Sequence, residues 1–296
     1  KWECLSKTRW RESTQGRDMP IMLPKGTDKK RKREREMRPV RPARAVRKAY
    51  LDALKTQTDI LRSQTGNLSD LVKSGAERRT VASELERMSL ETADRLRGDA
   101  PRIARAFVKA ADKAQKTQTE QALAKSLGVD FAKIIDSPAI AEKVDLAIDV
   151  NASLIKSIGA EHWGKVGKAV LDNYQGKLQG SLTDRLLALG DITENRAKFI
   201  ARDQTAKLTG MLTQARQEEN GIDEYVWRTA KDERVVGDPG GKYPEGSPGH
   251  MDHYEREGKV FRWDSPPPDG HPSEAYNCRC YAQARVNLDK LKAMYA

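Results

Sequence analysis

Cysteine and histidine gather near the C-terminal end of this sequence in a pattern that could bind a metal ion. Two cysteines stand one residue apart, and three of the four histidines lie shortly before them. Thiolate and imidazole are ligands that Zn²⁺ prefers, and a structural zinc site needs four such ligands. Zinc is therefore the candidate cofactor. The candidate ligands are Cys278, Cys280 and His253, with His271, His250 or Asp232 as the fourth.

A metal-free arrangement explains the same residues. Residues i and i+2 share one face of a strand, so Cys278 and Cys280 can be two buried thiols, with His253 hydrogen-bonded to Asp232. A disulfide between the two cysteines is disfavoured, because residues so placed on a strand seldom bring their β-carbons together correctly. The spacing fits no standard zinc finger, which slightly favours the metal-free interpretation.

Charged residues beside this cluster indicate a structural network. An Asp-x-Arg sequence after a strand is typical of a turn with a surface ion pair, which is worth little. Close to Arg279 or His253, however, Asp232 would make a two-pronged contact with the arginine or orient the histidine. We therefore expect a structural network of Asp232, Arg234, His253 and Arg279. A catalytic dyad is the less favoured interpretation, and no catalytic residue is assigned.

Positive charge is concentrated near the N-terminal end. The chain has 54 Lys and Arg against 43 Asp and Glu, a net charge of +11. Residues 29–48 alone hold eleven basic and two acidic residues, a net of nine. Such a run neutralises phosphates and gives salt-sensitive affinity for double-stranded DNA, unless it is simply solvated or docks on an acidic partner. The candidate nucleic-acid-binding residues are Lys29, Lys30, Arg31, Lys32, Arg33, Arg35 and Arg38.

The central part of the chain is helical in its pattern. Apolar residues recur three and four positions apart, as on one face of a helix. Ser137 and Ser181 are capping signals that mark the starts of two helices. Gly66 and the stretch 98–101 are expected to interrupt helices, and Thr193 is expected to begin one.

After the central part the apolar period changes. Residues 225–229, 258–263 and 280–286 are short β-branched and aromatic runs that predict three strands. The Gly- and Pro-rich loop 237–252 is long enough to be functional or a contact surface. The expected fold class is α+β, a mostly helical body with a small C-terminal antiparallel β module. Its parts are an extended basic arm over 1–45, a helical body over 46–220 and a small α/β module over 221–296.

Composition limits the class of protein. Charged residues make up 33% of the chain and aromatic residues 6%, which is typical of long helices with modest cores that partner subunits complete. No apolar run is long enough to predict a membrane span, and no secretory signal is evident. We therefore expect a soluble protein of the cell interior.

The C-terminal part of the sequence contains an ordered series of motifs. They lie, in order, at 196–205, 227–235, His253, 258–261, 266–268 and 277–280. This order resembles the phage Mu protein F-like head morphogenesis family of minor head proteins. Two features depart from the family pattern, a Gly- and Pro-rich insertion before His253 and Asp203 with Gln204 in place of Thr-Glu.

The resemblance implies a structural role and not an enzyme. It predicts a minor capsid protein of a tailed phage that binds the portal protein, contacts the major capsid protein and aids head assembly. Several copies per particle, contact of the basic arm with packaged DNA, and a location in the virion and in the host cytoplasm during assembly follow from the same resemblance. The alternative is a metal-dependent nuclease or a toxin-delivery protein built on the C-terminal His/Cys residues.

Overall fold

A computed structural model describes residues 2–4, 22–24, 34–127, 137–245 and 252–290. The chain forms two compact units. The sheet unit comprises Lys1–Ala43, Ala111–Lys143 and Thr205–Ala296. The helical unit comprises Arg44–Ala110 and Val144–Gln204.

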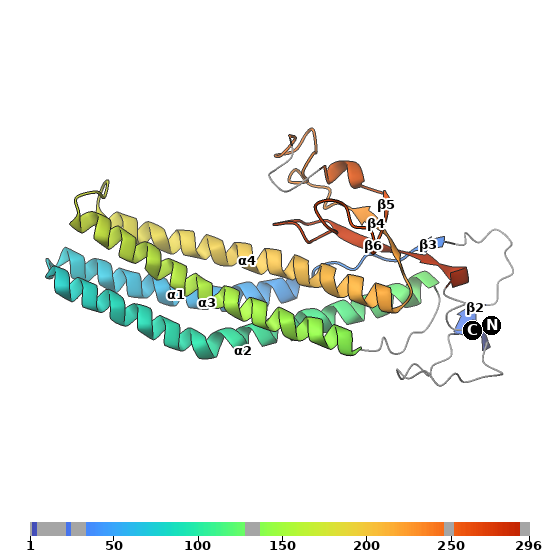
Figure 1. Cartoon of the computed structure of the whole chain (residues 1–296), viewed down its shortest axis with the longest axis horizontal. Coiled ribbons are helices and arrows are strands. Elements are labelled where there is room, and N and C mark those ends of the chain that lie inside the picture. Colours follow the sequence, from blue (N-terminus) through green and yellow to red (C-terminus); the bar gives the residue numbers. More distant parts are fainter. Residues whose placement is uncertain (1, 5–21, 25–33, 128–136, 246–251, 291–296) are drawn as a thin grey trace. The chain divides into compact units, whose positions relative to one another are not determined.

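Four long helices confirm the predicted helical body. Ser137 accepts a hydrogen bond from the backbone N–H of Ile140 at 3.2 Å and so caps one helix, as predicted. Ser181 accepts one from the N–H of Asp184 at 3.4 Å and begins the next. None of the described helices has an apolar stretch long enough to cross a lipid bilayer. The helices are α1 (Arg44–Lys73), α2 (Arg78–Leu127), α3 (Pro138–Tyr174) and α4 (Leu182–Glu219) (Figure 1).

The predicted helix interruptions were wrong. α1 continues through Gly66, α2 continues through Gly98 and Pro101, and α4 continues through Thr193. Helix propensity is a weak preference that packing overrides. The Thr193 hydroxyl, instead of capping a new helix, donates to the carbonyl of Leu189 at 2.8 Å, one turn earlier in the same helix.

The core of the helical unit lies between helices that run side by side (Figure 1). Gly159 permits a close approach of α3 to α2, because a β-carbon there would lie 2.8 Å from atoms of Leu96 and Thr92. Apolar side chains from α1, α2 and α3 fill the interior. They include Leu54, Leu61, Leu68, Leu96, Ile155 and Ile158.

His162 is a buried polar link within this unit. Its Nε2 lies 2.7 Å from the Thr65 hydroxyl and its Nδ1 lies 2.8 Å from the Thr193 hydroxyl. The ring therefore joins α3 to α1 and α4. Burial lowers the pKa of His162 to about 4, so the imidazole is neutral near pH 7.

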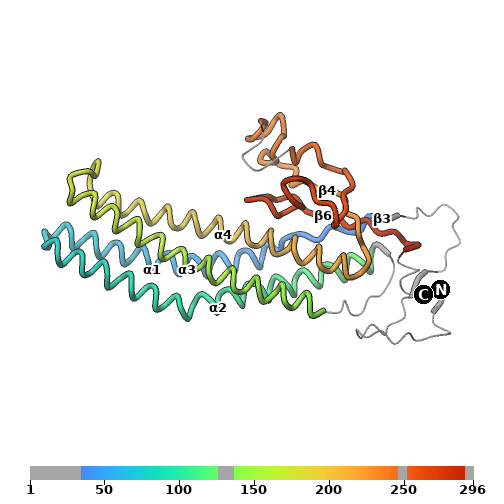
Figure 2. The backbone as a smooth tube through the Cα atoms, viewed as in Figure 1, coloured from blue at the N-terminus to red at the C-terminus, as the bar shows by residue number. Residues whose placement is uncertain are grey.

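The predicted antiparallel module is a four-stranded sheet with the order β3-β6-β4-β5. Figure 2 labels three of these strands, β3, β6 and β4. Large aromatic residues of β4 stand opposite alanines of β6, with Tyr225 paired to Ala284 and Trp227 to Ala282. This sheet confirms the α+β class. Its strands are β3 (Glu34–Glu36), β4 (Glu224–Arg228), β5 (Val260–Arg262) and β6 (Tyr281–Asn287); β1 (Trp2–Cys4) and β2 (Met22–Pro24) pair separately, and η1 (Tyr254–Arg256) is a short 3₁₀ helix.

β3 is a strand that the sequence did not predict, and it lies within the expected basic arm. It pairs antiparallel with β6, beginning with Glu34 opposite Asn287. The N–H of Met37 continues the contact by donating to the Ala284 carbonyl at 2.9 Å. Residues 34–37, within the basic run, are thus fixed to the sheet. Of the seven candidate DNA-binding residues, Arg35 and Arg38 are described and Lys29, Lys30, Arg31, Lys32 and Arg33 lie outside the described residues.

The sheet unit is built on the last turns of α4. The indole N–H of Trp263 donates to Gln217 Oε1 at 3.1 Å. Gly210 lets the loop before β6 approach closely, because a β-carbon there would meet Ser273 and Pro272 at 3.0 and 3.1 Å. These contacts fix the loops that carry the cysteines and histidines.

Candidate metal centre

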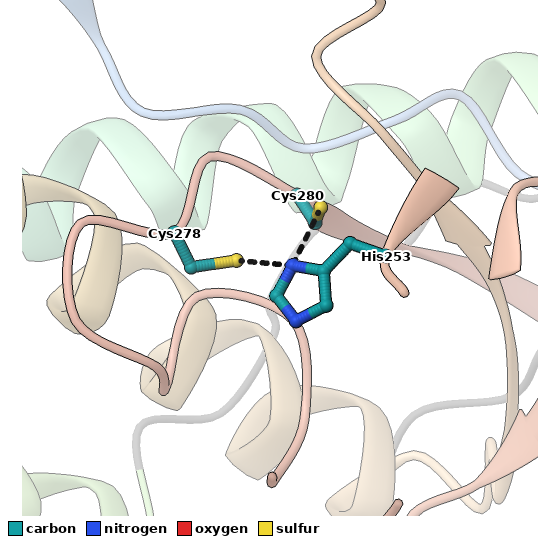
Figure 3. Close-up of side chains that lie close together, drawn as sticks. All are labelled: His253, Cys278 and Cys280. Atoms are coloured by element: carbon teal, nitrogen blue, oxygen red, sulfur yellow. Dashed lines mark hydrogen bonds between the residues drawn. The ribbon is translucent and has the colours of Figure 1, made fainter. Parts of the chain in front are cut away.

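His253, Cys278 and Cys280 converge at one buried point (Figure 3). His253 Nδ1 lies 3.7 Å from Cys278 Sγ and 3.6 Å from Cys280 Sγ. Zinc bound at its usual distances separates a sulfur and a nitrogen ligand by about 3.6 Å in tetrahedral geometry. All three ligand atoms lie within 4.8 Å of one another. The three side chains therefore form a group that can hold a metal ion.

A tight loop before β6 brings the two sulfurs to the same side. Asn277 adopts a left-handed backbone conformation with φ 59°, which Asn tolerates better than most residues. The N–H of Cys278 donates to the Ala275 carbonyl at 3.1 Å. The Ser273 hydroxyl donates to the Cys280 carbonyl at 2.8 Å. The loop is thus anchored at both ends of the Cys-x-Cys sequence.

The three groups share protons unequally. The hydrogen bond from Cys280 is the main cause that lowers the pKa of Cys278 well below its usual value, and His253 adds to it. The same hydrogen bond, with burial, raises the pKa of Cys280. Burial opposes a charge on His253, but the hydrogen bonds to Cys278 and Asp269 outweigh it and raise the pKa of His253. Metal binding here requires a neutral His253 and two cysteine thiolates, so the affinity depends on pH.

The partner of His253 differs from the one we expected. Asp269, and not Asp232, lies 3.0 Å from His253 Nε2, and Arg256 donates to its other oxygen at 2.6 Å. Asp269 is 7% exposed, so this pair is shielded from water. Histidines that bind a metal usually donate their second ring N–H to a carboxylate, which fixes the ring and makes it a better ligand. Asp269 occupies that position.

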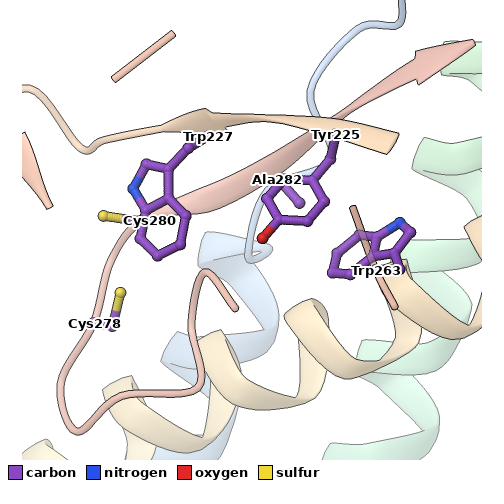
Figure 4. Packing of buried hydrophobic residues seen from close by; sticks show 6 residues of the cluster. All are labelled: Tyr225, Trp227, Trp263, Cys278, Cys280 and Ala282. Carbon is purple, nitrogen blue, oxygen red and sulfur yellow. The ribbon is translucent and has the colours of Figure 1, made fainter. Parts of the chain in front are cut away.

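Trp227 packs against the cluster and contributes a polar group to it (Figure 4). Its ring meets His253 edge-on at 5.1 Å between centroids, and the Arg256 guanidinium lies over it at 4.8 Å. Its indole N–H is buried without an oxygen or nitrogen acceptor among the described residues. This N–H lies beside the Cys280 sulfur, where it favours the thiolate. A buried donor beside a sulfur fits a site in which both cysteines are thiolates.

Asp232, Arg234 and Arg279 form the charged contacts that we predicted. Both oxygens of Asp232 accept hydrogen bonds from the Arg279 guanidinium. The backbone N–H of Arg234 donates to Asp232 at 3.1 Å, which makes a tight turn. Partial burial would raise the pKa of Asp232, but the hydrogen bonds from Arg279 and Arg234 outweigh it and lower the pKa. Arg279 stands between the two cysteines, so this ion pair braces the loop that carries them.

His271 is not part of the group, contrary to our expectation of a fourth ligand. Its Nδ1 lies 2.9 Å from the Tyr225 hydroxyl and its Nε2 lies 3.1 Å from the Trp263 carbonyl. Both ring nitrogens are therefore engaged by residues of the aromatic core that contains Tyr225 and Trp263. Asp232 is likewise engaged by Arg279, and His250 lies outside the described residues. The described part of the chain brings together three ligands.

A cavity of about 220 Å³ lies against the three ligand residues. His253, Cys278 and Cys280 all line it. Its other walls include two arginines of the predicted network, Arg234 and Arg279. They also include three residues that the sequence did not associate with the site, Tyr243, Tyr276 and Asn277.

Comparison with known proteins relates the chain to a longer protein. A Haemophilus influenzae protein, described as an uncharacterized protein, is 39% identical to this chain over 196 residues. The match covers 64% of this chain and 40% of the relative, so the chain spans less than half of the length of that relative. No family model matches the chain, and no solved structure matches it.

Proposed function

We propose that this chain is a minor head protein of a tailed phage, which binds the portal protein during head assembly. The observation that carries the proposal is the convergence, within the sheet unit, of residues from the 227–280 part of the family resemblance. Trp227 packs on His253, and His253 lies close to both cysteines. Asp232 forms an ion pair with Arg279, the residue between the two cysteines. In this proposal the sheet unit is a docking element, and the basic run 29–48, which contains β3, contributes contact with packaged DNA and the major capsid protein.

Zinc is the metal that we assign to the three ligands. Two thiolates and one imidazole form a ligand set that selects zinc over magnesium or calcium. Bound zinc would join His253, directly before η1, to the loop before β6, and no strand ladder joins the described residues of these two places. A four-stranded sheet with two strands of only three residues is small, and small modules need such an additional link.

Co-expression with the portal protein of the same phage tests this function. The full chain is expected to comigrate with the portal oligomer in size-exclusion chromatography. His253→Ala, which removes the link between the two segments, is expected to reduce the portal-bound fraction at least several-fold. Asp264→Asn, a change of an exposed carboxylate that pairs with Arg262, should leave it unchanged. A folded chain that never comigrates with the portal would reject the proposal.

A further inference from the structure

The proposed zinc site is one ligand short within the described part of the chain, and this inference rests on that site. His271 and Asp232 have other partners, which leaves His253, Cys278 and Cys280. Tetrahedral zinc with three protein ligands keeps a fourth position for water or for a ligand from another molecule. The question is where that position faces and what it would accept.

The cavity gives a fourth ligand access to the site, because all three ligand residues line it. Its volume of about 220 Å³ is smaller than the ~300–1,000 Å³ of typical small-molecule sites. This size suits one inserted side chain better than a nucleotide. Tyr243 and Tyr276 line the cavity and are 45% and 64% exposed. Exposed tyrosines beside an arginine are typical of residues that dominate protein–protein interfaces.

Charge selects the class of ligand. Zinc with two thiolates and a neutral imidazole is formally neutral. Two arginines, Arg234 and Arg279, line the cavity, and Asp232 pairs with Arg279. Together these three residues carry one net positive charge. An anion would neutralise this charge. A carboxylate can bind zinc through one oxygen and a guanidinium through the other.

We infer that the cavity receives a carboxylate of a partner protein, which completes the zinc coordination and is neutralised by Arg234. The partner presents an acidic side chain or its C-terminal carboxylate. Docking and metal coordination are then one event, and the module binds its partner through the ion that also holds it together.

Cobalt substitution tests this inference with the full chain. Co²⁺ takes the same ligands as zinc, and its visible absorption reports the number and type of those ligands. Acetate, added at constant ionic strength, is expected to change that absorption in a saturable manner. Arg234→Gln should leave the starting spectrum unchanged and weaken acetate binding about tenfold, the effect of losing one charge-assisted hydrogen bond. Arg262→Gln, an exposed arginine that does not line the cavity, should behave as the unchanged chain.

Each other outcome overturns a defined step. A chain that binds no cobalt lacks the proposed metal site altogether. A chain that binds cobalt but does not respond to acetate has a closed site, and only the present inference fails; a changed starting spectrum in His250→Ala would then identify the fourth ligand. A stronger response to inorganic phosphate than to acetate would replace the carboxylate by a phosphoryl group. Comigration with the portal is measured separately, so its failure is distinguishable from all three.

Discussion

At the scale of single residues, Asp269 decides how well His253 can serve as a metal ligand. Asp269 accepts from both His253 and Arg256 in a place that is almost closed to water. Asp269→Asn keeps the size of the side chain but removes its charge. We expect zinc affinity to fall about 10–100-fold, the usual effect of losing such a supporting carboxylate. Competition against a chromogenic chelator measures it.

The matched control for this change is Asp264→Asn. Asp264 is exposed and pairs with Arg262, away from the metal ligands, so its loss should not alter zinc affinity. Equal affinities for all three proteins would show that Asp269 supports the packing of the loop and not the metal.

The sequence identified part of the site because residue type and spacing carry that information. Three residues of types that bind zinc converge, Cys278, Cys280 and His253. The Asp232–Arg279 pair joins two oppositely charged residues of the predicted structural network. Asp269 could not be found in this way, because it lies in a proline-rich turn on the other side of β5 from His253, and only the fold brings the two together. His271 is a residue type that can bind zinc, but other residues engage both of its ring nitrogens. The sequence alone does not show these contacts.

At the scale of elements, capping signals proved more informative than interruptions. A cap residue satisfies backbone groups locally, so Ser137 and Ser181 are readable from sequence. Glycine or proline within a helix costs about 1–3 kcal/mol, and burial of the surrounding apolar face can offset this cost.

β3 was also missed because tertiary contacts decide its structure. Its three residues, Glu-Arg-Glu, have no apolar period, and pairing with β6 alone makes them a strand.

His162 makes the helical unit sensitive to acid. Its pKa is lowered from 6.5 to about 4, so between these values the unfolded chain binds a proton that the folded chain does not. The free energy of unfolding therefore rises with pH across this window. The contribution of His162 to stability is fully present above about pH 6.5 and is lost as pH falls towards 4. The loss amounts to about 3 kcal/mol. Urea unfolding at pH 7 and pH 4.5 measures it.

His162→Gln provides the comparison for this prediction. Glutamine can keep a polar contact to Thr65 or Thr193 but does not titrate. The variant is expected to be less stable than the unchanged chain at pH 7 and to lose less stability on acidification, since carboxylates elsewhere affect both proteins alike. An equal loss in the two proteins would mean that His162 is not the acid-sensitive group.

At the scale of the whole molecule, the two units depend on different interactions. The helical unit has its own apolar core and the polar link at His162. The sheet unit has the metal ligands, the aromatic cluster and the paired strands. A ligand that binds the folded state at a hundred times its dissociation constant stabilises that state by about 2.7 kcal/mol. Zinc should therefore stabilise the sheet unit and leave the helical unit nearly unaffected.

Hydrogen exchange with and without a chelator tests this separation. Removal of zinc is expected to speed amide exchange about 100-fold in β4, β6 and the loop 263–280, where opening must break the metal site. Exchange in α1 and in residues 144–174 of α3 should change little, because those amides open without disturbing the site. Cys278→Ser should show the chelated pattern whether or not zinc is added. Equal acceleration in both units would show that the chain opens as a single body, and the zinc site would then stabilise the whole protein instead of one docking element.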